Sequence, residues 1–82
     1  MKYVLAFKPR ARRDLKTSGS ENLQRVLEKI EALTDNLAGD VKRPTDYTPE
    51  FRLRVGDYPI LFEIDGSTII VYRIVHRREA YR

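Results

Sequence analysis

The sequence contains no cysteine, which excludes a disulfide framework and any metal site built from thiolates. It also lacks a long hydrophobic run, because the apolar stretch near its start gives way at once to dense positive charge. That stretch is too short for a signal sequence or a membrane span. The sequence shows no internal repeat, linker or convincing cluster of metal ligands. We therefore expect a cytoplasmic protein that uses no metal or other cofactor.

The charge of the chain is distributed unevenly. Its 82 residues are 41% hydrophobic and 34% charged, as in an ordinary small globular domain with a single core. Residues 1–16 hold six basic side chains and one acid, whereas the six basic side chains of residues 50–82 are all arginine. Arginine presents a planar fork that binds phosphate oxygens in pairs. Nucleic acid is therefore the first partner to consider.

The first half of the chain predicts one strand and two helices. Residues 2–7 predict the strand, and residues 9–17 a helix, which Pro9 can start because its fixed φ suits the first turn. Apolar residues then recur at helical spacing and predict a second helix from Ser20 to about Asn36. Residues 38–49 are expected to form a polar loop.

The remainder predicts three strands joined by two-residue turns at residues 56–57 and 65–66. Counting outward from these turns pairs Ile60 with Leu53 on one side and with Val71 on the other, on the face that the helices would cover. The predicted fold is α+β with the element order β-α-α-β-β-β. A helical hairpin would pack on one face of a small, mainly antiparallel, curved sheet.

The opposite face of the predicted sheet mixes guanidinium, aromatic and aliphatic groups. Arginines that alternate with apolar residues along a strand often form no more than its solvent-facing side. The same mixture is also suited to a phosphate and a base, so both interpretations stay open at this point. The counting above places Pro59 and Tyr72 beside Arg54. The face then carries Arg52, Arg54, Pro59, Tyr72, Ile74 and His76.

A basic stripe is predicted on the outer side of the first helix. Lys8, Arg12 and Lys16 follow one another four residues apart, with Arg13 beside them. Like charges at this spacing destabilise a helix slightly. The stripe is therefore either a solvated helix face or a surface that meets an anionic partner.

Three motifs make the chain resemble a known family. The segments "FRLRVGDY", "ILFEI" and "HRREAYR", within the element order above, closely resemble the RelE/ParE superfamily of toxins from type II toxin–antitoxin systems. The resemblance covers essentially the whole chain and implies a single RelE-like toxin domain over residues 1–82. Toxins of the RelE branch cut messenger RNA in the ribosomal A site without a metal. Toxins of the ParE branch inhibit DNA gyrase, and an antitoxin holds both kinds inactive.

The resemblance also assigns candidate catalytic residues. Arg52 and Arg54 stand where the RelE branch places basic residues beside the scissile phosphate. Arg77 matches the arginine that stabilises the transition state, and Tyr81 matches an aromatic on which a base stacks. The chain departs from the family at Pro59, where many members carry an arginine, so one catalytic cation is absent.

Proton transfer is the difficult part of the implied reaction. Attack by a ribose 2′-OH adds negative charge to the phosphate, and each preorganised guanidinium group can stabilise that charge by about 2–4 kcal/mol. Arginine keeps its protons, however, so Arg52 and Arg54 are poor general bases. His76 and Tyr81 are the candidates for moving a proton.

The leading interpretation is a ribosome-dependent mRNA endoribonuclease that inhibits translation. The alternatives are a ParE-like gyrase inhibitor and a catalytically weakened member that acts mainly by binding its antitoxin. The expected partners are the ribosome, mRNA and a cognate antitoxin, with which the toxin would form a hetero-oligomer on operator DNA; no membrane partner is expected. The expected surface for RNA or the ribosome comprises Lys8, Arg12, Arg13, Lys16, Arg73 and Arg78.

Overall fold

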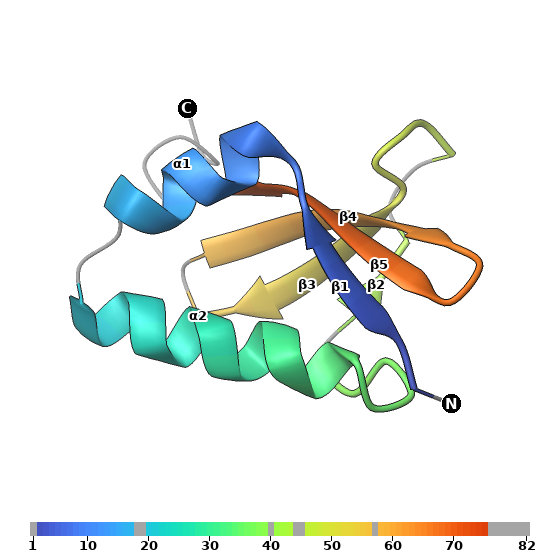
Figure 1. Cartoon of the computed structure of the whole chain (residues 1–82), viewed down its shortest axis with the longest axis horizontal. Helices are drawn as coiled ribbons and strands as arrows, with labels where there is room; N and C mark the ends of the chain where they lie inside the picture. Colours follow the sequence, from blue (N-terminus) through green and yellow to red (C-terminus); the bar gives the residue numbers. More distant parts are fainter. Residues whose placement is uncertain (1, 18–19, 40, 44–45, 57, 76–82) are drawn as a thin grey trace.

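Two helices pack on a five-stranded sheet in the computed structural model of the chain (Figure 1). The structure describes residues 2–17, 20–39, 41–43, 46–56 and 58–75. The helices are α1 (Pro9–Thr17) and α2 (Ser20–Leu33). The strands are β1 (Val4–Phe7), β2 (Val41–Lys42), β3 (Phe51–Val55), β4 (Tyr58–Asp65) and β5 (Thr68–Ile74).

The sheet has the strand order β1-β5-β4-β3-β2. β1 runs parallel to β5, and the other neighbouring strands are antiparallel. The α+β class and the mainly antiparallel sheet are confirmed. The prediction of a polar loop over residues 38–49 is wrong at Val41–Lys42, because these two residues pair with β3 as a short edge strand.

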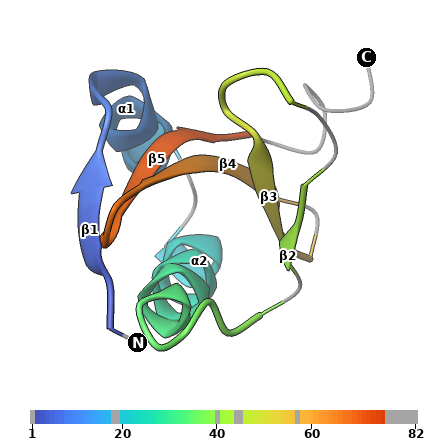
Figure 2. The same cartoon turned by 90° about the vertical axis from the view of Figure 1, so that its right-hand side faces the viewer.

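The core lies between the sheet and the helices. Figure 2 shows the curved sheet arching over α2, with α1 on the side of β1 and β5. α2 contributes residues at helical spacing, and α1 contributes a small alanine that allows close approach. The buried residues are Ala11, Val26, Ile30, Leu33, Leu53, Val55, Ile60, Phe62, Ile69, Val71 and Ile74.

α2 ends earlier than its apolar periodicity predicts. It stops at Leu33 rather than near Asn36, because the carbonyl of Thr34 accepts the Tyr3 N–H at 2.8 Å and joins the chain to the start of β1. Asn36 then adopts a left-handed φ of 58°. Leu37, which extended the predicted periodicity, still packs against the core, but from the turn rather than from the helix.

The first predicted hairpin has the observed register, and the second does not. Asp65 pairs with Thr68, so the turn lies one residue later than predicted. Val71 therefore lies opposite Phe62 rather than opposite Ile60.

A β-bulge follows in the β4–β5 pair. The register shifts between Leu61 and Phe62, so that Val71 and Ile74 are both buried in the core and two residues of β5 lie between them. Ile74 was expected on the exposed face, and that prediction is wrong because the bulge reverses the alternation. The argument that placed His76 on the same face as Arg54 relied on the same alternation, and His76 itself lies outside the described residues.

Candidate functional site

β3 presents its two arginines on the exposed face of the sheet. Arg52 and Arg54 are both exposed, while Leu53 and Val55 are buried on the opposite side. The alternation within "FRLRV" therefore has the predicted effect. Neither guanidinium group has an ion-pair partner among the residues that the structure describes.

A third cation lies next to them. Lys42 of β2 is the cross-strand neighbour of Arg52, and the same row continues through Leu61 of β4 to Arg73 of β5. This row crosses four adjacent strands of the sheet, β2, β3, β4 and β5. Neighbouring strands in a sheet are about 4.8 Å apart. Lys42 is exposed and makes no ion pair within the described part of the chain. Reasoning from the sequence missed it, because it assigned these residues to a loop.

Arg73 is held by α1. Its Nε lies 3.0 Å from Oδ2 of Asp14, and its Nη2 lies 3.3 Å from Oδ1 of the same carboxylate. Oδ2 of Asp14 also accepts the backbone N–H of Ile74 at 2.9 Å. One largely buried carboxylate therefore joins α1 to β5 immediately after the bulge. Arg73 was predicted to bind RNA, but in this arrangement its charge is balanced by Asp14.

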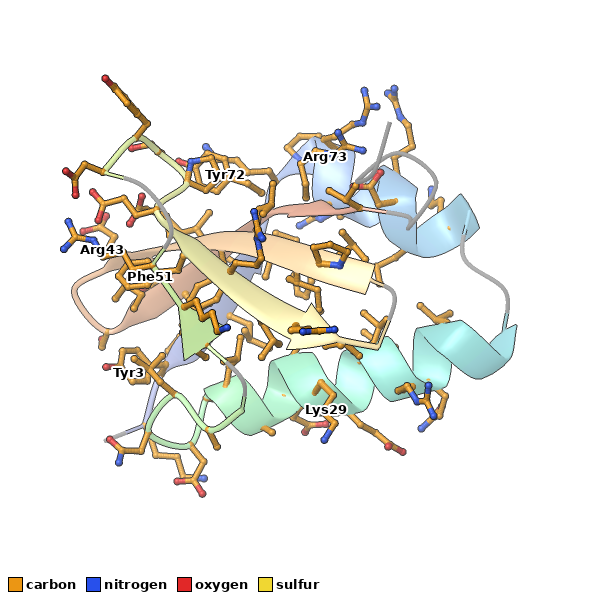
Figure 3. The ribbon with its side chains drawn as sticks, turned by 180° about the vertical axis from the view of Figure 1, so that it is seen from behind. Tyr3, Lys29, Arg43, Phe51, Tyr72 and Arg73 are labelled. Atoms are coloured by element: carbon orange, nitrogen blue, oxygen red, sulfur yellow. The ribbon has the colours of Figure 1, made fainter. Side chains whose placement is uncertain are left out.

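The basic stripe of α1 reaches the exposed face of the sheet through Lys8. The Nζ atom of Lys8 lies over the ring of Tyr72, 5.2 Å from its centroid, in a cation–π contact. Figure 3 shows Tyr72 and Arg73 above the sheet, with Arg73 next to α1. All members of the stripe are exposed: Lys8, Arg12, Arg13 and Lys16.

Pro59 lies opposite Arg54, as the register of the first hairpin predicts. Its predicted neighbour on the other side was Tyr72, and that prediction is wrong. The carbonyl of Pro59 accepts the N–H of Val75 at 2.9 Å, which shows that its backbone groups face β5. Because Pro59 has no N–H, it donates no hydrogen bond, but none is lost to β3. The position lies at the end of the β4–β5 ladder.

A second ion-pair cluster braces the loop between β2 and β3. Arg43 Nε lies 2.9 Å from Oε2 of Glu50, and Arg43 Nη2 lies 3.3 Å from Oδ1 of Asp46. Glu63 of β4 accepts the backbone N–H of Glu50 at 3.2 Å. The carboxylates of Asp46 and Glu50 balance Arg43, which distinguishes it from the arginines of β3.

The remaining predicted site residues, His76, Arg77, Arg78 and Tyr81, lie outside the described residues. Within the described ranges, no group of three or more histidine, cysteine, aspartate or glutamate side chains is placed to hold a metal ion. Neither of the two helices described here is long and apolar enough to cross a membrane. The exposed sheet face offers cations on a rigid support, an arrangement suited to binding phosphate groups.

Comparisons with known proteins place the chain in a family of toxins. Residues 5–81 match the family described as the ParE toxin of type II toxin–antitoxin systems, parDE. Toxin RelE3 from Methanocaldococcus jannaschii is 40% identical over 47 residues, which are 57% of this chain and 53% of that protein. The match thus spans about half the length of that relative.

Two solved structures resemble the whole fold. In the RelB–RelE antitoxin–toxin complex from Methanococcus jannaschii, the similar chain has a TM-score of 0.76 and 34% identity, over 93% of this chain and 94% of that chain. In the toxin–antitoxin complex RelBE2 from Mycobacterium tuberculosis, the TM-score is 0.80 at 29% identity, over 94% of this chain and 100% of that chain.

Proposed function

Because the chain belongs to the RelE/ParE superfamily of toxins from type II toxin–antitoxin systems, we propose that it is an endoribonuclease that cuts messenger RNA on the ribosome. The observation that carries this proposal is the group of open cations on the exposed sheet face: Lys42, Arg52 and Arg54. A binding surface for a polyanion needs cations that internal carboxylates do not already balance. The similarity to RelE proteins supports the choice of RNA as that polyanion.

In the proposed reaction the ribose 2′-OH attacks the adjacent phosphorus, and negative charge grows on the phosphoryl oxygens. Arg52 and Arg54 are fixed on a strand whose other face is buried, so they require little reorganisation as that charge develops. We assign transition-state stabilisation to Arg77 as well, base stacking to Tyr81 and proton transfer to His76. These assignments follow the family's motif.

The toxin's partner in the cell is a cognate antitoxin, which is supported by the two similar structures described above, both of them toxin–antitoxin complexes. We propose that the antitoxin places carboxylates against the open cations, because covered guanidinium groups need paired anions. The ribosome would contact the stripe on α1, and the toxin would act in the cytoplasm. The described stripe residues are Lys8, Arg12, Arg13 and Lys16.

A second candidate function is inhibition of DNA gyrase without hydrolytic chemistry. The match of residues 5–81 to the ParE toxin family favours it. This function would use the same exposed surface for binding and would leave every phosphodiester bond intact. The two candidates therefore differ in whether RNA is cut.

The experiment that separates them uses toxin freed from its antitoxin. Ribosomes programmed with a defined message are incubated with the toxin, and primer extension maps the 5′ ends of the fragments. We expect cuts within the ribosome-bound codons and none in free message. Intact message together with blocked gyrase supercoiling would transfer the assignment to the ParE type.

A further inference from the structure

Lys42 has a property that the two arginines of β3 lack, because its ammonium group can give up a proton. We propose that Lys42 is a catalytic residue that donates a proton to the leaving 5′-oxygen during RNA cleavage. This inference rests on the proposed ribonuclease function. It starts from the pairing of Lys42 with Arg52 across the β2–β3 ladder, with both side chains exposed on the same face.

The chemistry requires such a donor. The 2′-oxygen forms a bond to phosphorus as the bond between phosphorus and the 5′-oxygen breaks, and the 2′-OH proton passes to a base, the role proposed above for His76. The products are a 2′,3′-cyclic phosphate and a 5′-alkoxide, which is a poor leaving group until it is protonated. Lys42 would supply that proton as an ammonium and would regain one from water after the cut.

The other cations around the site are less suited to this task. Arg52 and Arg54 keep their protons, and Arg73 is engaged by Asp14. Pro59, opposite Arg54, carries no charge. Lys8 is a lysine near this face, but it lies over Tyr72 beside β5, and β4 separates that strand from β3.

The electrostatics of the row also point to an anionic ligand. Like charges directly opposite each other on neighbouring strands are destabilising. Lys42 and Arg52 form such a pair, and no carboxylate within the described ranges makes an ion pair with either. A phosphate placed between them would neutralise both and would bring the ammonium group next to the phosphodiester.

The test compares Lys42→Arg and Lys42→Ala with the wild type in single-turnover cleavage on programmed ribosomes. Lys42→Arg keeps the charge and loses the transferable proton. We expect both variants to cut at least about a hundredfold more slowly, the usual scale for loss of a general acid. Lys29→Arg, at an exposed position of α2 outside the proposed site, is the matched control and should cut at the wild-type rate. Thermal unfolding should show all variants folded, because both lysines are exposed.

A second substrate makes the assignment specific. In a message with a single 5′-bridging sulfur at the cut site, the thiolate leaves without protonation, so both Lys42 variants should regain the wild-type rate. Wild-type cleavage by Lys42→Arg on the ordinary message, or no rescue by sulfur, would overturn the proposal. Rescue of His76→Ala instead would assign the donor to His76. Absence of cleavage by the wild type would overturn the ribonuclease function itself, and the role of Lys42 with it.

Discussion

The cationic side chains of the sheet and its neighbouring loop fall into two groups. Arg43 and Arg73 are held by carboxylates, whereas Arg52 and Arg54 have no ion-pair partner among the residues described. All four look alike when charges are counted along the sequence. The position of a carboxylate therefore distinguishes a cation that supports the fold from one that is available to phosphate. This difference predicts separate effects on activity and on stability.

The largest effect should come from removing both open arginines. Replacing Arg52 and Arg54 together with alanine should slow single-turnover cleavage on programmed ribosomes by at least about a thousandfold, since we propose that each stabilises charge in the transition state. Both side chains are exposed, so the free energy of unfolding in urea should change by less than about 0.5 kcal/mol. If this double variant lost as much stability as variants of the carboxylate-held arginines, the distinction between the two groups would be wrong.

The opposite result is expected for the pair that joins α1 to β5. Asp14→Ala or Arg73→Ala should lower the free energy of unfolding by about 1–3 kcal/mol, because charge-assisted hydrogen bonds are lost around a carboxylate that is only 12% exposed. Urea titrations of the two single variants and the double variant measure the coupling. Additive losses would show that the two side chains do not stabilise the protein as a pair.

Pro59→Arg should add an open cation opposite Arg54. Cleavage should rise at least about tenfold, or about 1.4 kcal/mol in transition-state stabilisation. Pro59→Ala is the control that relieves the backbone without adding charge. If the two variants cut alike, or neither differs from the wild type, position 59 is not a vacant cation site.

The stripe on α1 should act on binding rather than on the chemical step. Replacing Arg12 and Arg13 with alanine should reduce the dependence of log affinity for ribosomes on log salt by about 1–2. The rate at saturating toxin should stay within about twofold of the wild type, because neither residue contacts the scissile phosphate in this account. Filter binding over a range of salt concentrations measures the first quantity. An unchanged slope would mean that the stripe is a solvated helix face.

Local patterns predicted the part of the site that lies on regular structure. Alternation in "FRLRV" was enough to place Arg52 and Arg54 outside the core, and the Gly56 turn was enough to place Pro59 opposite Arg54. The second hairpin could not be counted from its turn. There Gly66 takes φ 61° as the first residue of the turn, and the bulge then moves Ile74 into the core.

Other parts of the site depend on contacts between distant segments. Lys42 belongs to a two-residue strand, which is too short for any periodicity to predict. Asp14 is the one acid among residues 1–16, yet its binding of Arg73 requires the helix to lie against β5. The early end of α2 likewise depends on Tyr3, which lies at the other end of this half of the chain. Such tertiary contacts leave no local signal in the sequence.

The most direct measurement is single-turnover cleavage of ribosome-bound message by the wild type, Arg54→Ala and Arg43→Ala. Both substitutions remove one arginine, but Arg43 is balanced by Asp46 and Glu50. The account predicts that the wild type cuts, that Arg54→Ala is slower by about a hundredfold, and that Arg43→Ala cuts within about twofold of the wild type. Intact message with the wild type, or equal losses in the two variants, would contradict it.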